Sequence, residues 1–91
     1  MINEVQLAWV LATVADPYLN TAERHDVYIE IAVGDTFAAI CRLLAIVARE
    51  DRTLPEDFVT ELDRWLDAYV GHDEEPRLRA LIHRVKTHRA R

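Results

Sequence analysis

The stretch from Thr36 to Ala48 constrains the fold most, because every residue in it except Thr36 and Arg42 is apolar. If this stretch is a helix, Arg42 lies on a narrow polar stripe with Asp35 and Arg49, each seven residues away. A helix that is apolar nearly all round must be covered by other elements or by another chain. We therefore expect an all-α, compact bundle of about five short helices around a central apolar helix at residues 36–50.

The length and composition indicate a single helical domain that spans residues 1–91. A chain of 91 residues with 51% hydrophobic residues can bury a core without disulfides or metals. Only two glycines occur, and alanine, leucine, glutamate and arginine, which favour helices, are abundant. We expect the last five or so residues to be frayed.

Three further helices are expected at the two ends of the chain. The first spans residues 2–15 and ends at Asp16-Pro17, because the residue before a proline avoids the helical conformation. A fourth helix is expected to open with a capping box at residues 53–56, run to Val70 and stop at Gly71. A fifth begins after Asp73, its expected N-cap, and ends near Lys86.

The segment 21–33 carries two competing patterns. Asn20 followed by Glu23 is typical of a helix N-cap with a capping box. Residues 27–33, however, alternate like a strand and are rich in β-branched side chains. We favour a helix from Thr21 to Val33, because no second strand candidate exists to pair with it. A strand here would have to pair with another molecule.

The charge is divided unevenly along the chain. Residues 1–76 contain all 16 acidic residues and five arginines, whereas residues 77–91 contain six basic residues and no acid. The basic segment could contact nucleic-acid phosphates. Alternatively, its charges could balance the acidic helix that precedes it. The candidate nucleic-acid contacts are Arg77, Arg79, Arg84, Lys86 and Arg89.

No catalytic, metal-binding or nucleotide-binding motif is present in the sequence. The four histidines lack the spacing of a helical zinc site, and the single Cys41 lies within the apolar helix as a small hydrophobic residue. The carboxylates share helix faces but have no convergent partner, which is typical of a solvated surface. We therefore predict no enzymatic activity, no cofactor and no bound metal.

Apolar surface is in excess of what one small bundle can cover. The first and third expected helices both have wide apolar arcs, and a five-helix domain can surround only one such helix. Soluble monomers seldom expose large contiguous apolar patches. We therefore expect an interface, most simply that of a homodimer. Its candidate residues are Val5, Trp9, Val10, Tyr28 and Arg42.

Taken together, these patterns predict a small acidic protein-interaction module that self-associates and acts as an adaptor, regulator or inhibitor of a larger protein. The alternative is a nucleic-acid-associated regulator that uses the basic C-terminal helix. No uninterrupted apolar run has the length of a membrane span, so we expect no membrane partner and a cytoplasmic location. Ten arginines against one lysine suggest a bacterial or phage origin.

Overall fold

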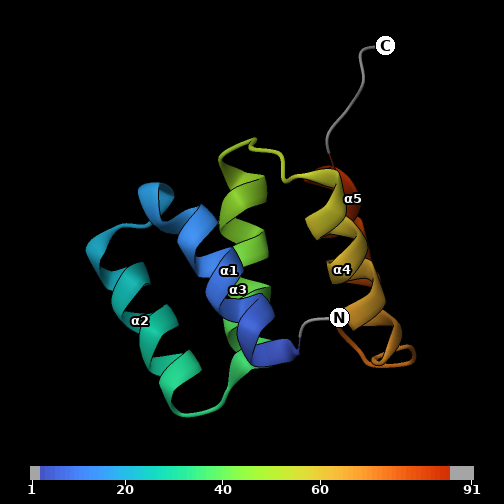
Figure 1. The fold of residues 1–91 in the computed structure, drawn as a ribbon, viewed down its shortest axis with the longest axis horizontal. Helices are drawn as coiled ribbons and strands as arrows, with labels where there is room; N and C mark the ends of the chain where they lie inside the picture. Colours follow the sequence, from blue (N-terminus) through green and yellow to red (C-terminus); the bar gives the residue numbers. More distant parts are fainter. Residues whose placement is uncertain (1–2, 87–91) are drawn as a thin grey trace.

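The computed structural model describes residues 3–86 and shows an all-helical bundle with α3 in the middle (Figure 1). In Figure 1, α1 lies in front of α3, α2 lies on one side, and α4 and α5 lie on the other. The helices α1, α2 and α5 all pack against α3. The predicted architecture is therefore confirmed. The elements are α1 (Glu4–Ala15), a short 3₁₀ turn η1 (Asp16–Tyr18), α2 (Thr21–Ala32), α3 (Thr36–Arg49), α4 (Glu56–Asp67) and α5 (Glu75–Arg84).

The core is centred on α3, as its apolar sequence requires. Ala39, Ile40, Leu43 and Leu44 of this helix are fully buried. Leucine, isoleucine and valine side chains from the surrounding elements complete one continuous cluster. Burying each large apolar side chain contributes about 1.5–3 kcal/mol. The fully buried large side chains outside α3 are Leu7, Leu11, Val27, Leu54, Leu62, Leu66, Leu78 and Ile82.

Residues 21–32 form a helix, so the strand alternative for residues 27–33 is wrong. The Asn20 side chain accepts a hydrogen bond from the Glu23 amide at 2.8 Å, and the Glu23 carboxylate accepts from the Asn20 amide at 3.0 Å. This capping box confirms the sequence signal at the start of α2. Gly34 has a φ of 88° just beyond the helix, a backbone conformation that favours glycine and ends the helix.

The predicted boundaries of α4 and α5 need correction. Thr53 does not cap α4, because the backbone at Leu54 pairs instead with the end of α5: its N–H donates to the Val85 carbonyl at 2.8 Å. The N-cap of α4 is Pro55, without a side-chain hydrogen bond, and the helix ends at Asp67, three residues before Val70. The N-cap of α5 is Glu74 rather than Asp73.

The start of α1 and the lengths of the helices bear on two further points of the sequence analysis. Asn3 and Gln6 form a second capping box at the start of α1, in addition to the predicted ones. Among residues 3–86, every helix is too short or too polar to cross a membrane. The expected fraying of the C-terminal residues concerns a segment outside the described part of the chain.

Candidate functional site

The helix α1 divides into a buried inner face and an exposed outer face. Its inner face packs on α3 and is fully buried. The side chains of Val5, Trp9, Val10 and Val14 are instead 37–48% exposed, although they are large and apolar. We call the exposed side of this helix the outer face of α1. It consists of Val5, Gln6, Trp9, Val10, Thr13 and Val14.

The outer face of α1 carries no charge. From Val5 to Ala15 the sequence contains no acidic, basic or histidine residue. The single charged residue of α1, Glu4, directs its carboxylate toward α3 and α4 instead. The other helices all carry exposed charged residues. A wholly uncharged, partly apolar helix face on an acidic molecule is typical of a protein contact surface.

Tyr28 of α2 extends this face at one edge. The ring centroids of Trp9 and Tyr28 lie 5.8 Å apart with an interplanar angle of 33°, within the range of favourable aromatic pairs. The Tyr28 hydroxyl lies 3.3 Å from Asp16 Oδ1, and Asp16 also accepts from Arg24 Nε at 2.9 Å. These bonds fix the ring of Tyr28 beside Trp9. An open hollow of about 400 Å³ lies over the same side of α2.

The two polar side chains of the outer face are held by their own helix. Gln6 Oε1 accepts from the Asn3 amide at 3.1 Å, as part of the capping box. The Thr13 hydroxyl donates to the Trp9 carbonyl at 3.0 Å. Within residues 3–86, the side-chain amide N–H groups of Gln6 have no acceptor. Both side chains are therefore oriented, but each keeps hydrogen-bonding capacity that points away from the bundle.

The structure places four of the five predicted interface residues at this surface. Val5, Trp9, Val10 and Tyr28 are all exposed, and the rings of Trp9 and Tyr28 are in contact. Arg42 has a different setting. Its guanidinium donates twice to Glu30 of α2, from Nε at 3.1 Å and from Nη2 at 2.8 Å. This bidentate pair connects α2 to α3 and leaves Arg42 partly exposed, as expected for the polar stripe of α3.

On the inner side of the bundle, Glu4 forms a junction that sequence reasoning missed. Its carboxylate accepts hydrogen bonds from three side chains: the Thr36 hydroxyl, the Trp65 indole N–H at 2.7 Å and the Tyr69 hydroxyl at 2.6 Å. The Phe37 ring packs against both Trp65 and Tyr69, with centroid distances of 5.6 and 4.7 Å. Thr36 is the one buried polar residue among those described. We call this group the Glu4 junction.

The donors around Glu4 control its protonation. Partial burial raises the pKa of Glu4, but the hydrogen bonds from Thr36, Tyr69 and Trp65 together outweigh burial and leave the pKa below its ordinary value. The same contact, with burial, raises the pKa of Tyr69 to about 12, so that its hydroxyl stays protonated as a donor at neutral pH. The junction is thus an ionised acceptor held by neutral donors.

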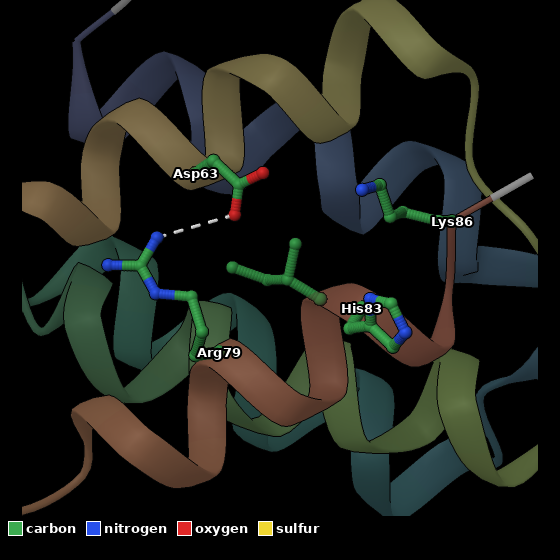
Figure 2. Close-up of a pocket in the computed structure, with 5 residues that line it drawn as sticks. Asp63, Arg79, His83 and Lys86 are labelled. Carbon is green, nitrogen blue, oxygen red and sulfur yellow. Dashed lines mark hydrogen bonds and ion pairs between the residues drawn. The ribbon is translucent and has the colours of Figure 1, made fainter.

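A second hollow lies between α4 and α5 and includes part of the basic segment (Figure 2). It measures about 380 Å³ and is lined by Asp63, Arg79, Ile82, His83 and Lys86. Figure 2 shows Arg79 reaching across to Asp63 of α4, with His83 further along α5 and Lys86 just beyond the end of that helix. Neither His83 nor Lys86 has a side-chain hydrogen bond or an ion pair within residues 3–86.

The arginines of α5 lie close to acids, but only Arg79 pairs with α4, the acidic helix named in the charge-balancing interpretation. Arg79 lies within 3.4 Å of Glu75, Asp63 and Asp67. The other two described arginines of the basic segment also lie close to carboxylates: Arg77 is 3.3 Å from Glu74 and Arg84 is 3.4 Å from Asp51. Such exposed pairs each contribute about 0–1 kcal/mol. Arg89 lies outside the described residues.

Cys41 is half-buried, and burial raises the pKa of its thiol to about 11, so it has little thiolate character. No group of three or more potential metal ligands converges within residues 3–86.

Comparison with known proteins finds no matching family model, no curated relative and no solved structure with significant similarity.

Proposed function

We propose that this chain is a small, non-enzymatic protein-interaction module that binds its partner through the outer face of α1, as an adaptor, regulator or inhibitor. The observation that carries the proposal is the exposure of Trp9 with three valines on a helix side without charges. Full burial of such a side chain contributes about 1.5–3 kcal/mol, and because these side chains are 37–48% exposed, a partner would recover about half of that from each.

The composition of this surface supports protein binding over other roles. The centres of protein interfaces are depleted in charge and enriched in tryptophan and tyrosine. Trp9 and Tyr28 provide both aromatic types side by side, and charged residues such as Asp16 and Arg24 lie at the rim. The hydrogen bond between Tyr28 and Asp16 orients one aromatic ring before any partner binds, which lowers the entropy cost of association.

The test is an affinity purification with three versions of the chain: wild type, Val10→Glu and Val70→Glu. Val70 is 71% exposed beyond the end of α4, so Val70→Glu is a matched control for adding a carboxylate to an exposed valine. We expect wild type and Val70→Glu to recover the same stoichiometric protein partner and Val10→Glu to lose it. Equal recovery of all proteins by wild type and Val10→Glu would refute the proposal.

The nucleic-acid alternative makes a different prediction in the same experiment. It relies on α5, where Lys86 has no acidic partner among the described residues. Under this alternative, nuclease treatment would abolish recovery, Arg84→Glu with Lys86→Glu would abolish retention on DNA, and retention would fall steeply with salt. The ion pairs of Arg77, Arg79 and Arg84 argue against it, because phosphate would have to compete with carboxylates already in place.

A further inference from the structure

The outer face of α1 has a pattern that is complementary to itself. Its six residues are arranged symmetrically about the midpoint between Trp9 and Val10. At about 100° per residue, Gln6 and Thr13 lie on the centre line of this face, with Val5 and Trp9 on one flank and Val10 and Val14 on the other. A twofold axis through the midpoint brings Gln6 of one copy opposite Thr13 of the other. It also places Trp9 beside Trp9 on one flank and Val10 beside Val10 on the other, so polar residues meet polar ones and apolar residues meet apolar ones. A face with this property can pack against a second copy of itself.

We propose that two copies of this chain pair through the outer faces of α1, with the two helices antiparallel about a twofold axis between Trp9 and Val10. This inference rests on the proposed function and names a second copy as the partner. Gln6 of one copy then lies opposite Thr13 of the other, and the two Trp9 side chains pack beside each other near the axis. A twofold axis makes the contact isologous and closed, so the assembly stops at a dimer.

The hydrogen bonds of Gln6 and Thr13 favour this register. Gln6 Oε1 already accepts from Asn3, so the unused groups of this side chain are its two amide N–H donors. The Thr13 hydroxyl already donates to the Trp9 carbonyl, so its oxygen has the capacity to accept. In the antiparallel pair, each Gln6 donates to Thr13 of the other copy. The symmetry gives two such bonds, one on each side of the axis.

Electrostatics favours the same arrangement. The chain has a net charge of −5, so most pairs of faces from two copies would bring carboxylates together. The outer face of α1 has no charge, and two copies can therefore meet there without that repulsion. Antiparallel packing also places the positive N-terminal end of each helix beside the negative C-terminal end of the other, whereas parallel packing would bring like ends together.

The size of the face sets the expected strength of the dimer. The helix α1 has 12 residues and is about 18 Å long at about 1.5 Å per residue. With Tyr28 at its edge, this face is smaller than the surface of about 800 Å² per partner that is usual for stable complexes. We therefore expect a reversible dimer whose population depends on concentration, measurable by sedimentation equilibrium.

The first experiment compares the dimerisation of wild type, Val10→Glu and Val70→Glu over a concentration series. We expect a monomer–dimer equilibrium for wild type and Val70→Glu. For Val10→Glu the dissociation constant should rise at least about tenfold, because two carboxylates approach near the twofold axis. A wild-type chain that stays monomeric at every concentration, or a dimer that Val10→Glu leaves intact, would overturn the inference.

The register is tested with Gln6→Glu, Thr13→Lys and the double variant. Glutamate keeps the acceptor that Asn3 uses in the capping box, so Gln6→Glu removes the amide donors without removing the cap. We expect each single change to weaken the dimer about tenfold and the double variant to recover most of that loss, because each new glutamate then faces a lysine of the other copy. In a parallel dimer, like charges would face each other and no recovery would occur, which would overturn the proposed geometry.

These outcomes separate the inference from the proposed function. A monomeric chain that still captures another protein through Trp9 and Val10 would overturn the second copy as partner and leave the interaction module intact. A dimer with the predicted register that captures no other protein would support the inference and leave self-association as the role of this face.

Discussion

The inner and outer faces of α1 belong to one helix of 12 residues but differ in whether their polar side chains have all their hydrogen-bond partners within the fold. At the inner side, Glu4 is ionised and its carboxylate accepts hydrogen bonds from Thr36 of α3, from Trp65 of α4 and from Tyr69 just beyond α4. At the outer side, Gln6 and Thr13 are oriented but keep unused hydrogen-bonding capacity among exposed valines. The comparison shows that the inner side completes its hydrogen bonds within the fold, whereas the outer side leaves hydrogen-bonding capacity for water or for the partner that we propose.

The largest effect is expected from the inner face. Leu11 is fully buried against α3, and Leu11→Ala removes its contacts and leaves a cavity. We expect the free energy of unfolding to fall by about 3 kcal/mol, measured by urea denaturation. A loss of less than about 1 kcal/mol would show that α1 is not firmly packed and that the distinction between its two faces is wrong.

The next effect concerns the Glu4 junction. Glu4→Gln can keep an oxygen for Trp65 and Tyr69, which both donate to Oε1, but it removes the charge and places an amide N–H group against the Thr36 hydroxyl, which donates to Oε2. We expect a loss of about 2 kcal/mol, since charge-assisted hydrogen bonds become neutral ones and one donor loses its acceptor. Glu56 occupies the equivalent first position of α4 but is exposed, so Glu56→Gln is a matched control with an expected loss of less than about 1 kcal/mol. Equal losses of unfolding free energy for both variants would show that Glu4 contributes only through its charge at the N-terminal end of the helix.

The pH dependence of the unfolding free energy tests whether Glu4 is ionised in the folded state. Because the folded state lowers the pKa of Glu4 below its ordinary value of 4.5, the junction contributes its full stability above that pH and loses it as the pH falls through the folded-state pKa. We expect the difference in unfolding free energy between wild type and Glu4→Gln to be constant from neutral pH to about pH 5 and to shrink below pH 4.5. A difference that grows on acidification would contradict the assignment.

The smallest effect on stability is expected from the outer face. Val10 is 43% exposed, and its truncation in Val10→Ala removes few contacts within the monomer. We expect a change of no more than about 0.5 kcal/mol at protein concentrations low enough to suppress dimerisation. The same variant should weaken any contact made by the outer face of α1. If Val10→Ala instead destabilised the monomer as much as Leu11→Ala, the outer face would have to be part of the core.

The fold was predictable because its signals are local. The apolar run of α3, the capping box at Asn20 and the glycine at position 34 each depend on residues within a few positions of one another. The exposure of Val5, Trp9 and Val10 was also predictable, because α1 and α3 together carry more apolar surface than one small bundle can cover, but Val14 was not among the predicted residues. The Asn3–Gln6 capping box has the same local spacing as the Asn20–Glu23 one and could have been found.

The Glu4 junction was not predictable, because its three donors lie 32, 61 and 65 positions along the chain. No pattern in a short window connects a first-turn glutamate to a tryptophan on another helix. The one available signal was its isolation as the only charged residue of an otherwise uncharged helix. The predicted start of α4 was wrong for a similar reason. The backbone of Leu54 bonds to Val85, far along the chain, and this contact replaces the expected local cap.

That backbone bond between Leu54 and Val85 also fastens the two ends of the α4–α5 hairpin to each other. The segment between Leu54 and Val85 therefore forms a loop that is closed at its base. The start of α4 cannot separate from the end of α5 unless this hydrogen bond breaks. In a hydrogen-exchange experiment, the amide proton of Leu54 would be released only when the hairpin comes apart. Its exchange rate would measure how often the base of this hairpin opens.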